Sequence, residues 1–250
     1  MRRSRRRGLS PAAYGIVVLA LAACGSPASP ATDTVTVLAA ASLTEAFDQL
    51  SADFTADHPG VRVEVSYGSS ATLVQQVNHG APADVVALAG ESAADPLDRS
   101  AVRASTPFAG NVLEIAVPPA NPAHVTGIDD LGRSGLKVVL CAPAVPCGRA
   151  ADATFAKAGV VPSVVSREVD VKATLSKVRL GEADAAVVYH SDVVAAGDAV
   201  TGVPIPDAAN SRLRYPIITL TEDPSAQAFV DYVVGERGQH TLRSFGFTSP

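Results

Sequence analysis

The chain has 250 residues, of which 47% are hydrophobic and 18% are charged. This composition is typical of a globular protein, and the length allows one large domain or two small ones. The formal charge of −5 already makes a nucleic-acid-binding protein a poor fit, because a protein needs a basic surface to bind phosphate backbones.

The first 23 residues have the pattern of a secretory signal peptide. Basic MRRSRRR precedes AAYGIVVLALAA, an apolar run too short to span a bilayer as a mature helix. SRRRGL also resembles a twin-arginine signal, which leaves the export route open. Removing the five signal arginines leaves 15 Lys and Arg against 25 Asp and Glu, a formal charge of −10.

The cleavage region LAAC, residues 21–24, resembles a bacterial lipobox, in which the cysteine becomes the lipidated first residue of the mature protein. The resemblance implies a lipid anchor on Cys24 and a position at the extracytoplasmic face of the cell membrane. An ordinary signal peptide followed by a free cysteine is the alternative. GSPASPATD at residues 25–33 predicts a flexible tether because it is rich in Pro, Ser and Ala, so residues 24–33 would form the lipidated cysteine and its tether.

Two cysteines remain after lipidation of Cys24, at Cys141 and Cys147. An even pair in an oxidising compartment indicates a disulfide bond. A metal site is the alternative, but the histidines lack the short spacing of metal ligands. They are His58, His79, His124, His190 and His240.

Strand-like and helix-like segments alternate from residue 34 onward. Alternating apolar and polar residues, or continuous apolar runs, predict strands at 34–40, 61–67, 83–89, 136–142 and 184–190. Helical periodicity and stop signals predict helices at 43–57, 70–80, 149–159, 171–181 and 224–247, the last broken near Gly235. Segments 111–119 and 213–220 are expected to be extended.

This alternation predicts an α/β fold with mostly parallel sheets. The series of strand–helix units is long for one sheet, so we expect two lobes. The chain would cross between them near Asn111 and Tyr215. Lobe 1 would then contain residues 34–110 and 217–250, and lobe 2 residues 111–216.

Hydroxyl groups and helix starts follow several of the predicted strands. Ser42, Ser70, Cys147 and Tyr189 each follow or end a strand, and Val171 begins a helix. Ligands of open α/β sheets bind at the carboxyl ends of strands, where helix N-termini offer unpaired N–H donors. The set therefore predicts an oxyanion site rather than a catalytic one.

Such a donor set suits a fully ionised tetrahedral anion such as molybdate, tungstate or sulfate. Hydrogen phosphate carries a proton that needs an acceptor, and an unmet buried polar group is penalised. An alternative role exists for Ser42, because SLTE at residues 42–45 matches a helix capping box. Ser69 and Ser70 also fit helix caps, and Tyr189 fits core packing.

Longer motifs carry a family resemblance. VLAAASLTEAF, YGSSATLVQQVNHGAPADVVALA, VPCG, VDVKATLSKVRLGEADAAVVYHSDV, RYPI and the final FGF together resemble the molybdate-binding proteins of bacterial ABC transporters. The resemblance covers nearly all of the chain after the signal. It implies a two-lobed type II periplasmic-binding fold with a hinge and a central ligand cleft.

The resemblance also implies a function and a set of contacts. The protein would capture molybdate, and tungstate as well, and deliver it to a membrane permease. Ser42 and Ser70 would donate hydroxyl and backbone hydrogens, Tyr189 its phenolic hydrogen, and Cys147 and Val171 backbone N–H groups. Molybdenum would be held as the oxyanion, with no direct metal ligand and no cofactor. Ala71 stands where the family has a third serine.

We therefore expect an exported, lipid-anchored, monomeric solute-binding protein that is not an enzyme and has no catalytic residue. A receptor for sulfate or another tetrahedral oxyanion is the alternative in the same class. A secreted serine hydrolase using Ser42 or Ser70 is the alternative among enzymes. It lacks the G-x-S-x-G elbow and a recognisable base.

Overall fold

The computed structural model describes residues 33–250. The predicted signal peptide, the lipidation site at Cys24 and the tether through residue 32 lie outside the described residues. Asp33, expected to end the tether, is instead the first residue of a strand, where it is aligned with Val61.

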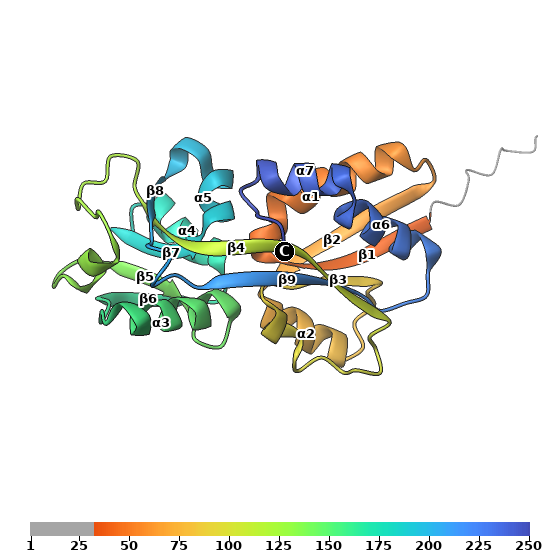
Figure 1. Ribbon diagram of the computed structural model, residues 1–250, viewed down its shortest axis with the longest axis horizontal. Coiled ribbons are helices and arrows are strands. Elements are labelled where there is room, and N and C mark those ends of the chain that lie inside the picture. The colour runs from red at the N-terminus through yellow and green to blue at the C-terminus, as the bar shows by residue number, and fades with distance from the viewer. Residues whose placement is uncertain (1–32) are drawn as a thin grey trace, which may run out of the picture. The chain divides into compact units, whose positions relative to one another are not determined.

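Nine strands and seven α-helices make up the described chain (Figure 1). The strands are β1 (Asp33–Ala40), β2 (Val61–Gly68), β3 (Val85–Ala87), β4 (Ala104–Val117), β5 (Val138–Cys141), β6 (Val164–Glu168), β7 (Ala185–Tyr189), β8 (Thr201–Pro204) and β9 (Arg212–Thr219). The helices are α1 (Thr44–Asp57), α2 (Ser70–Asn78), α3 (Pro146–Ala158), α4 (Val171–Arg179), α5 (His190–Ala196), α6 (Pro224–Val234) and α7 (Glu236–Ser244). None of the helices within residues 33–250 is long and apolar enough to cross a membrane.

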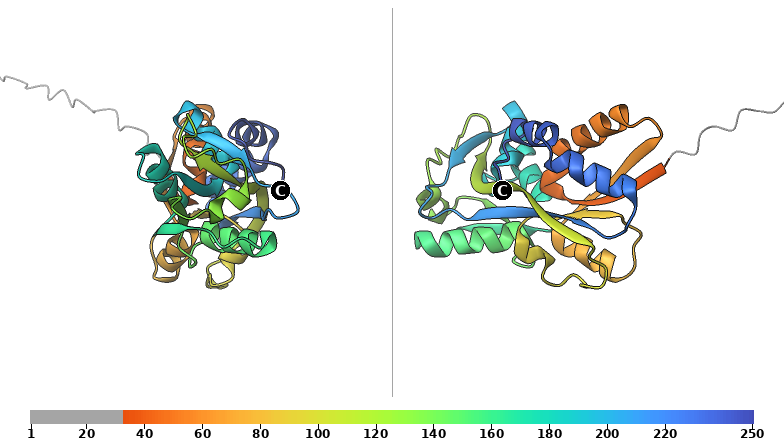
Figure 2. Two further views of the ribbon diagram at one scale, coloured as in Figure 1. Left: turned by 90° about the vertical axis from the view of Figure 1, so that its left-hand side faces the viewer. Right: turned by 45° about the vertical axis from the view of Figure 1, so that its right-hand side comes forward.

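The strands form two groups joined through the β4–β9 pair, in which β9 also pairs with β3 of one group and β4 with β7 and β8 of the other (Figures 1 and 2). The order is β2-β1-β3-β9-β4-β7-β5-β6, with β8 paired to β4. The first group contains β1, β2 and β3, and the second contains β5, β6, β7 and β8. Helices α1, α2, α6 and α7 accompany the first group, and α3, α4 and α5 the second.

Strand β4 belongs to both groups. Residues 104–112 pair with β9, whereas residues 113–117 pair with β7 and β8. The predicted crossing points Asn111 and Tyr215 lie on β4 and β9, and the lobe boundaries stay a prediction. All pairings of β4 and β9 are antiparallel, so the expectation of mostly parallel sheets is wrong. Strands β4 and β9 lack the crossover helices that make neighbouring strands parallel.

Helix α1 anchors the larger core. Its apolar positions recur at helical spacing, and the structure confirms that they share one buried face: Leu43, just before the helix, Phe47, Leu50 and Phe54 are all fully buried. The rings of Phe47 and Phe54 pack edge-to-face on Phe229 of α6 at 6.2 and 5.3 Å between centroids. Burial of this face fixes where α1 begins, and hence where residues 41–43 lie.

The opposite face of the first group is covered by α2. Leu38 and Val86 point into a smaller cluster with Leu73 and Val74 of α2, whereas their neighbour Val37 belongs to the larger core. Alternate residues of β1 therefore enter different cores, as in a sheet covered on both faces.

Most predicted elements are confirmed, including the break at Gly235 between α6 and α7. Strands β6 and β8 and helix α5 were missed. Strand β6 carries few strongly apolar residues because it lies at the edge of its group, and β8 spans only four residues. Helix α5 directly follows β7 with no loop to mark it.

Replacing Gly148 by Ala should lower the melting temperature by several degrees. An added Cβ would overlap the carbonyl oxygen of Ala142 and lie 2.8 Å from that of Cys141. Because both are backbone atoms, the turn has to move, at a cost of about 1–3 kcal/mol, or about 2–4 °C for each kcal/mol. Differential scanning calorimetry measures the change.

Gly127→Ala is the matched control, because Gly127 has extended backbone and an added Cβ there meets nothing within 4 Å. Its melting temperature should stay within about one degree of the wild type. Equal losses in both variants would contradict the close approach at Gly148.

Candidate functional site

The carboxyl ends of strands from both groups meet around one small cavity. Its volume is about 20 Å³, more than the roughly 10–15 Å³ that a single water requires. All five residues predicted to bind the ligand line it. The lining is Ala40, Ala41, Ser42, Gly68, Ser69, Ser70, Ala89, Val145, Pro146, Cys147, Asp170, Val171 and Tyr189.

Ser42 lies in a short 3₁₀ turn, Ala41–Leu43, between β1 and α1. The residue at the N-cap of α1 is Leu43, and no side chain caps that helix, so the capping-box interpretation of Ser42 is wrong. The Ser42 hydroxyl is instead 3.1 Å from the hydroxyl of Tyr215 on β9. It is 4% exposed and reaches the cavity from the first strand group.

The adjacent serines have different roles at the start of α2. The Ser69 hydroxyl accepts the Thr72 N–H at 3.2 Å and is the helix cap. The Ser70 hydroxyl accepts the Ala89 N–H at 2.9 Å, which leaves its own hydrogen free to donate. Ser70 is 1% exposed, and its backbone N–H lies in the first turn, where no partner exists within the helix.

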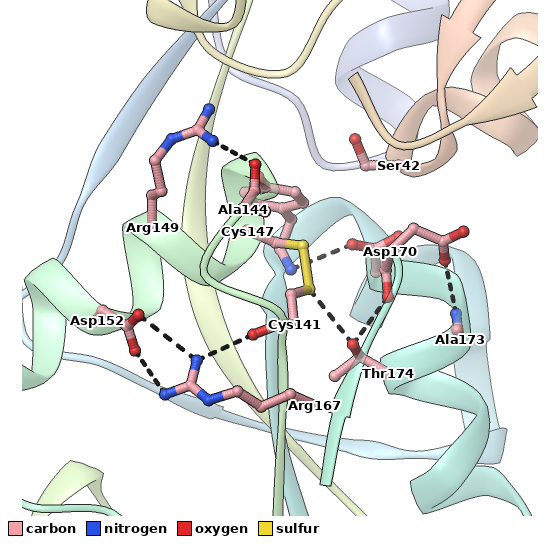
Figure 3. The surroundings of a disulfide bond; sticks show 12 residues. Ser42, Cys141, Ala144, Cys147, Arg149, Asp152, Arg167, Asp170, Ala173 and Thr174 are labelled. Carbon is pink, nitrogen blue, oxygen red and sulfur yellow. Dashed lines mark hydrogen bonds and ion pairs between the residues drawn. A yellow bond between two sulfur atoms is a disulfide. The ribbon is translucent and has the colours of Figure 1, made fainter. Parts of the chain in front are cut away.

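Cys147 enters the cavity at the start of α3, and a disulfide bond joins it to Cys141 at the end of β5 (Figure 3). The predicted pairing is therefore present, and the metal alternative for these cysteines is wrong. The Cα atoms are 5.7 Å apart, so the bridge closes the turn between β5 and α3. Pro146 precedes Cys147 at the helix start, where its fixed φ suits the helix and its missing N–H leaves no donor unpaired.

The same turn is held from outside by side chains. Arg167 of β6 donates to the Cys141 carbonyl oxygen at 3.1 Å and pairs with Asp152 of α3 at 2.9 Å (Figure 3). Arg149 donates to the Ala144 carbonyl oxygen at 2.7 Å. These contacts and the disulfide fix the backbone that presents Cys147.

Val171 begins α4, and its first-turn N–H has no partner within that helix. Asp170 caps the helix by accepting the Ala173 N–H at 2.8 Å (Figure 3). The Thr174 hydroxyl lies 3.3 Å from the Cys141 sulfur, so α4 packs directly on the disulfide. The starts of α3 and α4 therefore form one wall of the cavity.

Tyr189 ends β7 and is 1% exposed. Its hydroxyl, buried in the cavity wall, has no hydrogen-bond partner among residues 33–250. Burial raises the pKa of Tyr189 well above its usual value, and burial likewise raises the pKa of Tyr215. Both phenols therefore keep their protons at neutral pH and act as hydrogen-bond donors.

No Lys, Arg or His is present among the described residues that line the cavity. Its positive potential comes from the first turns of α2, α3 and α4, each the positive end of a helix dipole. Asp170, the one carboxylate that the sequence places at these strand–helix junctions, also lines the cavity and adds a negative charge to its wall.

Sequence patterns also missed the network behind Ser42. The Asn111 amide donates to the Ser191 hydroxyl at 2.8 Å and lies 3.4 Å from the Tyr215 hydroxyl. Asn111 is 2% exposed, so this amide is part of the core. The contacts join residues 80 and 104 positions apart, a separation that no local pattern reveals.

A neighbouring hollow carries the positive side chains that the cavity lacks. It shares Ala89 and Pro146 with the cavity and is also lined by Arg149, Arg212 and Arg214. Arg214 lies 3.5 Å from Glu91, and Arg212 lies 3.0 Å from Asp207. Within residues 33–250, no cluster of three or more His, Cys, Asp or Glu side chains is placed to hold a metal ion.

Solved structures share this architecture. The substrate-binding domain of a molybdenum ABC transporter from Clostridium difficile superposes with a TM-score of 0.68 at 27% identity, over 87% of this chain and 99% of that one. The periplasmic molybdate-binding protein of Azotobacter vinelandii gives a TM-score of 0.76 over 86% and 99% of the two chains; at 21% identity it supports the two-lobed fold alone.

Sequence comparisons agree. Residues 35–248 match the family model described as bacterial extracellular solute-binding protein. The molybdate-binding protein ModA of Mycobacterium tuberculosis is 39% identical over 248 residues, 94% of this chain and 95% of that protein. The chain therefore belongs to the bacterial extracellular solute-binding proteins, in the family that includes the molybdate-binding proteins.

Proposed function

We propose that the protein captures molybdate, and tungstate with it, outside the cytoplasm and delivers it to an ABC transporter permease. The observation that carries this proposal is the convergence of Ser42, Ser70, Cys147, Val171 and Tyr189 on one cavity. Hydroxyls and first-turn N–H groups surround it from both strand groups. The choice of molybdate as the anion rests on the names of the protein's relatives.

The donors suit a dianion without a cationic side chain. Each charge-assisted hydrogen bond contributes roughly 1.5–3 kcal/mol. The buried Tyr189 hydroxyl, unpartnered among residues 33–250, is a donor for which an oxyanion oxygen is the natural acceptor. The Arg149 side of the neighbouring hollow favours the approach of an anion to an otherwise acidic protein.

The two strand groups are the proposed lobes, residues 34–110 with 217–250 and residues 111–216. The cavity is lined from both, and β4 and β9 join them. Binding is proposed to close the lobes about these strands, as expected for a hinged receptor. Members of the family are exported solute-binding proteins. Anchoring through Cys24, the monomeric state and docking to a permease belong to the proposal.

A thermal-shift series with molybdate, tungstate, sulfate and phosphate tests the choice of ligand. The chain from residue 25 onward contains every described residue. At a concentration one hundred times Kd, a ligand stabilises the native state by about 2.7 kcal/mol, which raises the melting temperature by about 5–10 °C. Molybdate and tungstate should give this shift, and sulfate and phosphate much smaller ones.

The other outcomes assign the site differently. A larger shift with sulfate would make the protein a receptor for that anion. A larger shift with phosphate would contradict the proposed selectivity and make Asp170 the candidate acceptor for the proton of hydrogen phosphate. The absence of a shift with all four anions would contradict an oxyanion site.

Ser70→Ala should weaken molybdate binding by about 10- to 100-fold, because it removes a charge-assisted hydrogen bond. Ser69→Ala is the matched control: it removes the α2 cap and should lower stability by about 1 kcal/mol with little loss of affinity. Isothermal titration calorimetry and thermal melts separate the two effects. The reverse pattern would assign the ligand contact to Ser69.

Tyr189→Phe should leave the melting temperature without ligand unchanged or higher, because it removes a buried hydroxyl without a partner among the described residues. The stabilisation by molybdate should fall. A lower melting temperature without ligand and an unchanged molybdate shift would instead assign Tyr189 to packing alone.

A further inference from the structure

Three charged side chains form a chain of contacts beside the cavity. The Lys172 ammonium of α4 lies 2.6 Å from the Glu45 carboxylate of α1 and 3.1 Å from the Asp192 carboxylate of α5. The Asp192 side chain is fully buried, that of Lys172 is 25% exposed and that of Glu45 40% exposed. Lys172 thus joins a buried carboxylate to a partly exposed one.

Each member of this triad lies close in sequence to a cavity-lining residue. Glu45 follows Ser42 by three positions, and Lys172 directly follows Val171. Asp192 follows Tyr189 by three positions, and its second carboxylate oxygen accepts the Tyr189 N–H at 3.1 Å. A movement within the triad therefore displaces three segments that line the cavity.

The two contacts of Lys172 differ in what they join. Lys172 and Asp192 both accompany the second strand group, whereas Glu45 belongs to α1 of the first. Helix α4 also packs against the turn Ala41–Leu43 that carries Ser42. The Lys172–Glu45 contact therefore spans the two proposed lobes next to the cavity, and the Lys172–Asp192 contact stays within one.

The two carboxylates keep Lys172 protonated despite its partial burial. Burial raises the pKa of Asp192 to about 6, and the Lys172 ammonium and the Tyr189 N–H oppose this rise. Burial alone would lower the pKa of Lys172, but the Asp192 and Glu45 carboxylates more than offset it, so its pKa is raised. Lys172 is therefore cationic at neutral pH, and its removal would leave Asp192 without its cation.

We propose that Lys172, held by Asp192 in one lobe, latches the other lobe through Glu45 and so slows release of the bound oxyanion. The inference rests on the proposed function. Lys172 and Glu45 are positioning residues, because neither lines the cavity. An ion pair that forms when the lobes close stabilises the closed state alone, so its loss appears mainly in the dissociation rate.

Glu45→Gln tests the latch, because it removes the negative charge of the ion pair between the lobes and leaves the Lys172–Asp192 pair intact. Release of radiolabelled molybdate into excess unlabelled molybdate should become about three- to tenfold faster, the range expected for loss of one partly buried ion pair. Rising salt should accelerate release from the wild type and have little effect on the variant. The melting temperature without molybdate should change by at most about two degrees.

Glu182→Gln is the matched control. Glu182 follows α4 and pairs with Lys177 of that helix at 2.6 Å, the same separation as Glu45 and Lys172, but within one lobe. Its release rate should equal that of the wild type. Equal release from all three proteins would overturn the latch while molybdate binding itself stands.

Small-angle X-ray scattering without added anion supplies a second measurement that does not depend on the ligand. The Lys172–Glu45 contact favours the closed form over the open one in the protein without anion as well. Glu45→Gln should therefore shift the population toward the open form and increase the radius of gyration relative to the wild type and Glu182→Gln. If the wild type does not bind molybdate, the proposed function fails, and this measurement alone decides the latch. An unchanged radius would then overturn it.

Discussion

The antiparallel pairing of β4 with β9 is the constraint on which the rest of the structure depends. Residues 104–112 of β4 are held in register with β9, and the following residues pair with β7 and β8. One continuous strand thus belongs to both groups. This arrangement directs the strand ends of both toward a common cavity, and it places Asn111 and Tyr215 where their side chains support Ser42 and α5.

Cationic side chains are kept apart from the donors that line the cavity. Its wall presents hydroxyls and helix starts, whereas Lys172 lies behind the wall and the arginines lie in the neighbouring hollow. An ammonium inside the cavity would bind anions of many shapes. Donors fixed by helix starts and buried hydroxyls instead recognise where each oxygen lies, which suits selection among tetrahedral anions.

The turn between β5 and α3 shows how such donors are fixed. Gly148 allows the helix to approach the Ala142 carbonyl group, and the disulfide between Cys141 and Cys147 closes the turn. Arg167 and Thr174 hold it from two further elements. A backbone N–H presented in this way loses little conformational freedom when it binds, so more of its hydrogen-bond energy contributes to affinity.

The sequence by itself determined most of the strands and helices and a set of five candidate ligand contacts. The apolar spacing of α1, the alternation of β2 and the stop at Gly159 are local patterns, and the family motifs named Ser42, Ser70, Cys147, Val171 and Tyr189, which share one cavity. The tertiary structure alone decided what each group does there.

The sequence around Ser42 matched a helix-capping pattern, but the Ser42 hydroxyl contacts that of Tyr215. Helix α2 is capped by Ser69 and not by Ser70. Asp170 joined the wall, and Glu45, Lys172 and Asp192 came together from three helices. The antiparallel pairing of β4 and β9 could not be predicted from the sequence patterns either. The physical reason is the same throughout: hydrogen bonds and ion pairs between residues far apart in sequence depend on how elements pack, and local periodicity carries no record of that packing.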